Sequence, residues 1–118
     1  MNRIALLRIA AGFCFLAVAL GAFGAHALKE TLQASGMLDA WNKAVLYHLV
    51  HAVASVALAL SGSSNRAAYF LLAAGILLFS GSLYTMALTN VRWLGAITPI
   101  GGLCFLAGWA WLVIAPKL

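Results

Sequence analysis

Four long apolar stretches fill most of this sequence and determine which folds are open to it. They lie at about residues 5–26, 40–60, 67–88 and 93–115. Each is close to the roughly 20 residues that an α-helix needs to cross the hydrocarbon core of a bilayer. Their apolar residues run continuously instead of alternating with polar ones, which favours helices over strands. The sequence therefore predicts an all-α integral membrane protein with four transmembrane helices.

The composition agrees with lipid as the surrounding solvent. Only 8% of the 118 residues are charged and 65% are hydrophobic, whereas soluble domains carry roughly a quarter charged residues. We expect one domain, residues 1–118. The basic residues occur singly and form no cluster, so no nucleic-acid partner is expected. Cys14 and Cys104 are isolated within apolar stretches, which indicates neither a disulfide framework nor a metal motif.

The first stretch also has features of a secretory signal. Arg3 and Arg8 precede its apolar centre, and Ala25-His26-Ala27 has the small-residue pattern of a cleavage site. Because three further apolar stretches follow, we interpret it as a retained first span.

The connection between the first two spans, about residues 27–39, is the only long one. Leu28 and Leu32 are four residues apart, with polar residues between them. This spacing predicts a short amphipathic helix lying in the membrane interface. Gly36 is suited to end that helix, and Asp39 to cap the next one.

Short turns at about residues 61–66 and 89–92 make the following spans antiparallel, which predicts an up-down-up-down bundle. Four basic residues then fall on the side of the termini: Arg3, Arg8, Arg66 and Lys117. Three fall on the opposite side: Lys29, Lys43 and Arg92. The positive-inside rule favours cytoplasmic termini, in a multi-pass protein of the inner (plasma) membrane.

Polar side chains gather in the half of the bundle nearest the long connection. The candidate site residues are His26, Tyr47, His48, His51, Ser80, Ser82, Tyr84 and Thr98. The 1.5 Å rise of a helix places them at similar depths on all four spans. Imidazoles inside a hydrophobic stretch are costly unless something pairs with them. The sequence therefore raises the question of their partners.

Three interpretations of this polar cluster remain open. The first is an interhelical hydrogen-bond network that sets helix register. The second is a ligand pocket open to the outer face, holding a small molecule, a quinone or a lipid headgroup. The third is a metal or haem site formed by His26, His48 and His51. No carboxylate is near to orient these rings, so the sequence predicts no metal and no cofactor.

Catalysis finds little support in the sequence. No serine or cysteine lies in a nucleophile motif, and no acidic residue lies inside a span. We therefore expect a protein that is not an enzyme.

Glycines mark the expected packing surfaces. Gly95, Gly101, Gly102 and Gly108 form two small-residue grooves along the fourth span. Such grooves allow close helix approach, either within the bundle or to a partner. We expect the lipid bilayer as surroundings, and a homo-oligomer or membrane-protein partner at this span. Pro99 should kink the same helix.

Four segments in this order resemble a known family. They are residues 21–28 (GAFGAHAL), 41–52 (WNKAVLYHLVHA), 79–84 (FSGSLY) and 95–102 (GAITPIGG). Together they are similar to the YgdD-like small inner-membrane proteins, a family of unknown function with a eukaryotic mitochondrial relative. The resemblance covers nearly the whole chain. It implies a multi-pass membrane protein of unassigned activity and supplies no catalytic residues.

Two function classes follow from the sequence. The first is a non-enzymatic structural or interaction protein whose polar cluster holds the helices together. The alternative is a binder or transporter of a small ligand, a quinone or a metal that uses the same cluster.

Overall fold

The computed structural model describes residues 2–61 and 65–117. Its elements, in order, are α1 (Arg3–Ala25), α2 (Lys29–Ala34), α3 (Leu38–Leu60), α4 (Arg66–Gly75), the π-helix η1 (Ile76–Ser80), α5 (Gly81–Thr89), the 3₁₀ helix η2 (Arg92–Ala96) and α6 (Thr98–Ile114). The four predicted spans are confirmed. Helices long and apolar enough to cross a membrane cover Arg3–Ala25, Leu38–Leu60, Arg66–Thr89 and Arg92–Ile114. The centre of the predicted 61–66 turn lies outside the described residues.

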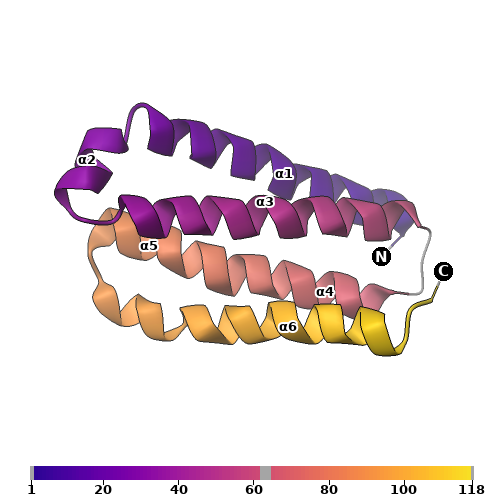
Figure 1. Cartoon of the computed structure of the whole chain (residues 1–118). Helices are drawn as coiled ribbons and strands as arrows, with labels where there is room; N and C mark the ends of the chain where they lie inside the picture. Colours follow the sequence, from indigo (N-terminus) through magenta and orange to yellow (C-terminus); the bar gives the residue numbers. More distant parts are fainter. Residues whose placement is uncertain (1, 62–64, 118) are drawn as a thin grey trace.

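The spans lie side by side, with both chain ends at one end of the bundle and α2 at the other (Figure 1). α3 is central: it packs against α1, α4, η1 and α5. α6 packs against α4 and η1, on the far side of the bundle from α1. The bundle is 46 Å long, which is about the thickness of a bilayer with its headgroups.

The connector between α1 and α3 contains the predicted short helix. Leu32 of α2 is fully buried, and it meets Met37 and Trp41 in one apolar cluster. Gly36 follows α2 with φ +74°, a conformation that favours glycine, and so ends the helix as predicted. Asp39 does not cap α3, because the helix begins one residue before it. It lies in the first turn and pairs with Lys43 at 3.2 Å.

Trp41 has a different role from the one the sequence indicates. A tryptophan near the start of a span is typical of an interface anchor. Here only 1% of Trp41 is exposed, and its Nε1–H donates to the Leu20 carbonyl at 2.9 Å. Gly24 makes this possible, since a Cβ there would lie 2.3 Å from Trp41 Nε1. Trp41 therefore fixes α3 against the end of α1.

The third and fourth spans are not continuous α-helices. The third passes through the π-helical turn η1, which no sequence signal predicts. The fourth begins with η2 and becomes α-helical only at Thr98. Pro99 lies in the first turn of α6, where its missing N–H leaves no intrahelical bond unmade. The predicted kink within one helix is thus a change of helix type before the proline.

The glycines of the fourth span serve the bundle itself at two positions. A Cβ on Gly101 would lie 2.2 Å from the Phe79 backbone nitrogen, and one on Gly108 would lie 2.8 Å from Leu72 Cδ2. These two glycines let α6 approach the third span closely. Gly102 is different, because the nearest atom to its Cβ position is 4.0 Å away, on Phe79.

The arrangement generates a prediction about orientation. The shared end of the bundle carries Arg3, Arg66 and Lys117, and the acidic residues Glu30 and Asp39 belong to the opposite end. We expect a fluorescent protein fused after residue 118 to fold in the bacterial cytoplasm and give signal. An alkaline phosphatase fusion at the same point should be inactive. An active phosphatase with no fluorescence would reverse the orientation.

Candidate functional site

The polar side chains predicted from the sequence do not form one cluster. The structure separates them into His26 alone, a His51 group, a His48–Tyr84 pair, and serine contacts around Ser80, Ser82 and Thr98. The partners of each group decide what chemistry it can support.

His26 stands apart from the other histidines. It caps the C-terminal end of α1, is exposed, and places Nδ1 2.9 Å from the carbonyl of Ala22 in its own helix. It closes the end of a helix and contacts neither His48 nor His51.

His51 has both ring nitrogens engaged. The Trp109 Nε1–H donates to His51 Nε2 at 3.0 Å. Because an indole nitrogen can only donate, His51 Nε2 must be unprotonated. His51 Nδ1 then carries the proton and donates to the Tyr47 carbonyl at 2.7 Å. The two partners together select the neutral Nδ1–H tautomer, and they link α3 to α6.

Aromatic rings surround this bond. The His51 ring stacks on Phe105 with centroids 3.7 Å apart. Tyr47 meets Phe79 in a tilted arrangement with ring centroids 4.8 Å apart, and 43% of the Tyr47 surface is exposed. His51 is only 5% exposed. Such a ring, enclosed and saturated with hydrogen bonds, has no free nitrogen for a metal or a substrate.

His48 has one engaged nitrogen and one free nitrogen. Its Nδ1 lies 2.9 Å from the Tyr84 hydroxyl, across the interface of α3 and α5. In the described part of the chain, His48 Nε2 is the single buried side-chain nitrogen or oxygen without a hydrogen-bond partner. The Phe13 carbonyl also interacts with the ring, outside hydrogen-bond geometry to Nε2. The side chain is 3% exposed.

The hydroxyl groups lock helices together. Ser80 Oγ donates to the Ala44 carbonyl at 2.7 Å and ties η1 to α3. Ser82 Oγ and Thr98 Oγ1 are 2.6 Å apart and join the third span to the fourth. Ser82 also donates to the Phe79 carbonyl at 3.0 Å. These bonds account for the predicted hydroxyl groups as packing contacts.

No metal centre is assembled by these residues. Across residues 2–61 and 65–117, no three histidine, cysteine, aspartate or glutamate side chains gather closely enough to hold an ion. The His26, His48 and His51 rings point to different partners, so the geometry does not bring together the three candidate metal ligands.

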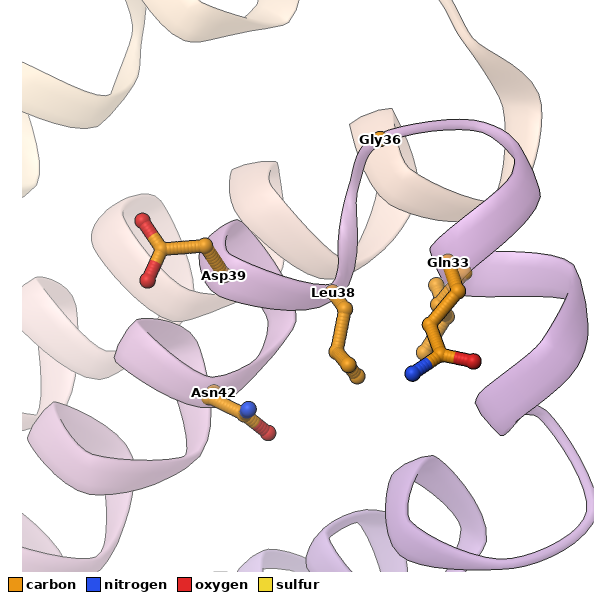
Figure 2. A pocket seen from close by; sticks show the side chains of 6 residues that line it. Gln33, Gly36, Leu38, Asp39 and Asn42 are labelled. Carbon is orange, nitrogen blue, oxygen red and sulfur yellow. The ribbon is translucent and has the colours of Figure 1, made fainter.

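Two hollows lie in the half of the bundle near α2. One is an open notch at the α2–α3 corner, lined by Leu32, Gln33, Gly36, Leu38, Asp39 and Asn42 (Figure 2). The other is an apolar cavity of about 150 Å³ beside His48. It is lined by Phe13, Leu16, Leu20, His48, Ile76, Leu77, Gly81 and Tyr84.

Sequence reasoning missed several contributors. Trp109 binds His51, yet it lies in an apolar stretch where a tryptophan usually signals packing or an interface. Tyr69 donates to the Leu6 carbonyl at 2.7 Å, in the half of the bundle away from the predicted polar cluster. Phe13 meets His48 edge-on at 6.2 Å. The one available signal was the polar atom that Trp and Tyr carry, which needs a partner when buried.

Comparison with known proteins gives the family. Residues 20–102 match the family model described as "Protein of unknown function (DUF423)". The chain belongs to this family. YwdK of Bacillus subtilis, called a UPF0382 membrane protein, is 47% identical over 106 residues, covering 85% of each chain. YgdD of Escherichia coli K12, called a UPF0382 inner membrane protein, is 42% identical over 106 residues, covering 85% of this chain and 79% of YgdD.

The family membership confirms the resemblance drawn from the four segments. A third relative, SSP2132 of Staphylococcus saprophyticus, is also called a UPF0382 membrane protein and is 47% identical over 103 residues, covering 84% of this chain and 85% of the relative. No solved structure matches this chain significantly. With its four spans, this DUF423 protein is a multi-pass protein of the inner (plasma) membrane.

The His51 bond yields a prediction with a matched control. Replacing Trp109 by Phe keeps an aromatic ring but leaves His51 Nε2 buried without a donor. We expect unfolding free energy to fall by roughly 0.5–2 kcal/mol, the range for interhelical bonds in membranes. Trp111→Phe is the control, because Trp111 is similarly exposed, 43% against 41%, in the same helix. Thermal unfolding in mild detergent measures both, and equal midpoints would contradict the importance of the bond.

Proposed function

We propose that this DUF423 protein is not an enzyme and acts as a structural or interaction protein of the membrane. One observation carries the proposal: the histidines point apart, and each binds a group of its own bundle. His26 meets a carbonyl of α1, His48 meets Tyr84, and His51 lies between Tyr47 and Trp109. Such bonds set helix register and leave no assembled group to activate a substrate.

The alternative of a small-ligand or quinone binder has support at one place only. The cavity beside His48 has an apolar lining, and the His48 ring that borders it has one nitrogen without a hydrogen-bond partner. A metal binder or transporter has no comparable support, because the histidine nitrogens do not converge.

Metal and optical analysis tests the structural role of the histidines. We expect the protein purified in mild detergent to carry no stoichiometric zinc, copper or iron and no haem band. A His48→Ala, His51→Ala double variant should have the same metal content and a lower unfolding free energy. The loss should be roughly 2–5 kcal/mol, because large-to-small replacement adds to the lost bonds. Stoichiometric metal in the wild type alone would overturn the proposal.

The outer face of α6 is our proposed contact surface for a second copy of the chain. Most of α6 is left uncovered by the bundle: Leu103 and Leu106 are 64% and 66% exposed, and Val113 is 82% exposed. Gly102 lies beside this face with free space around it, so another helix can approach closely there. Gly101 and Gly108 are already used inside the bundle and are not part of the surface.

Replacement of Gly102 tests this contact. We expect native mass spectrometry from mild detergent to show a dimer for the wild type. Gly102→Leu should shift it to monomer, because the side chain would hold the two helices apart. Gly12→Leu is the control, since Gly12 is exposed on α1 and nothing lies within 4 Å of its Cβ position. A monomeric wild type, or equal dimer in both variants, would contradict the proposal.

A further inference from the structure

We propose that the cavity beside His48 binds a lipid-soluble carbonyl compound whose polar head is about the size of one six-membered ring, with His48 Nε2–H donating to its carbonyl oxygen. The inference goes beyond the proposed function and does not depend on it, because a ligand site and a self-association face are separate features. It rests on the cavity, the free nitrogen and the opening of the cavity toward lipid.

The size and lining of the cavity define what fits. Its volume is about 150 Å³, and the walls are almost entirely apolar side chains of α1, η1 and α5. A dry apolar cavity of about this volume accommodates a benzene-sized molecule. Charged and strongly hydrated molecules are excluded, since nothing in the lining offers them a counter-charge.

His48 supplies the polar contact and its direction. The Tyr84 hydroxyl has His48 Nδ1 as its hydrogen-bond partner, at 2.9 Å. With the hydroxyl donating to Nδ1, the ring proton resides on Nε2. Nε2–H is then a buried donor that the Phe13 carbonyl approaches only outside hydrogen-bond geometry, and leaving such a donor unsatisfied is costly. A carbonyl oxygen is the complementary group, whereas an ammonium or a hydrocarbon is not.

Access to this site is from the bilayer. The lining residues come from α1, from α3 at His48 and from the η1–α5 segment. In the bundle, α3 lies between α1 and the third span (Figure 1). Leu16 and Leu77 line the cavity and are also 49% and 62% exposed on the outside of the bundle. An apolar tail can therefore leave the cavity directly into the surrounding lipid.

Two local features distinguish the site. The π-helical turn η1 contributes Ile76 and Leu77, and π-turns within α-helices occur frequently at functional sites. Phe13 lies edge-on to His48, with ring centroids 6.2 Å apart. Because His48 Nε2 is fully covered, a ligand reaches it only when neighbouring side chains move.

The test uses the full chain in lipid nanodiscs and acetophenone labelled with ¹³C at its carbonyl. The ketone carbon resonance moves when its oxygen accepts a hydrogen bond. We expect a saturable shift with the wild type, beyond the partitioning seen in empty nanodiscs. Toluene has the same ring and no carbonyl, so it should compete roughly three- to tenfold more weakly than unlabelled acetophenone, as expected for one neutral hydrogen bond.

Variants separate the pocket from the hydrogen bond. His48→Asn keeps a polar group within reach of Tyr84 but removes the distal donor, so it should weaken binding at least threefold. Gly81→Leu should abolish binding, because Gly81 lines the cavity and the space at its Cβ position is open. Gly12→Leu, outside the cavity, should bind as the wild type does. Circular dichroism melts establish that each variant is folded.

The contrary results are distinct. If the wild-type protein gives a shift that rises only linearly with acetophenone concentration, as empty nanodiscs do, the binding site is overturned. Unchanged binding in Gly81→Leu would place the ligand elsewhere and overturn it too. Binding that is lost in Gly81→Leu but unchanged in His48→Asn would overturn recognition by His48.

Discussion

Buried polar groups in lipid have no water to bind, and this constraint governs the interior of the bundle. The helices satisfy their own backbones, but His, Ser, Tyr and Trp side chains must find partners across helix interfaces. The central helix α3 carries or receives most of these bonds. It donates and accepts through His48 and His51, and its Ala44 carbonyl accepts from Ser80. His48 with Tyr84 and Ala44 with Ser80 join α3 to the third span, and His51 with Trp109 joins it to the fourth.

The interface between α3 and α1 is held by a different kind of contact. Trp41 lies over Gly24 and donates to the Leu20 carbonyl, so a large ring fills the space that a glycine leaves. The same exchange of large for small recurs at α6, where Gly101 admits the backbone at Phe79 and Gly108 admits Leu72. Glycines thus set how closely the helices approach, and polar side chains set their register.

The His48 side of the bundle departs from this pattern of close packing and satisfied polar groups. Elsewhere in the described residues, buried side-chain polar atoms have partners, whereas His48 Nε2 has none, and the His48 side chain borders an apolar cavity. The π-helical turn lies at the same level. Natural sequences break local rules most often where function requires it, and three departures from regular packing coincide here. This is why the cavity, and not the saturated His51 group, is the place to look for a ligand.

The length of the apolar stretches determined the four spans, their order and their approximate ends. A stretch of about 20 apolar residues crosses lipid as a helix, because a helix satisfies all its backbone hydrogen bonds internally. Gly36 marked the end of α2, because glycine readily adopts the positive φ that ends a helix. The tertiary structure decided which polar groups meet. It separated His26 from the other histidines, gave Trp109 to His51, and buried Trp41 in place of an interface position. These outcomes depend on the rotation of each helix about its axis and on the interruptions η1 and η2. Apolar stretches without a polar face carry no signal for that rotation, so only the packing of the four helices settles it.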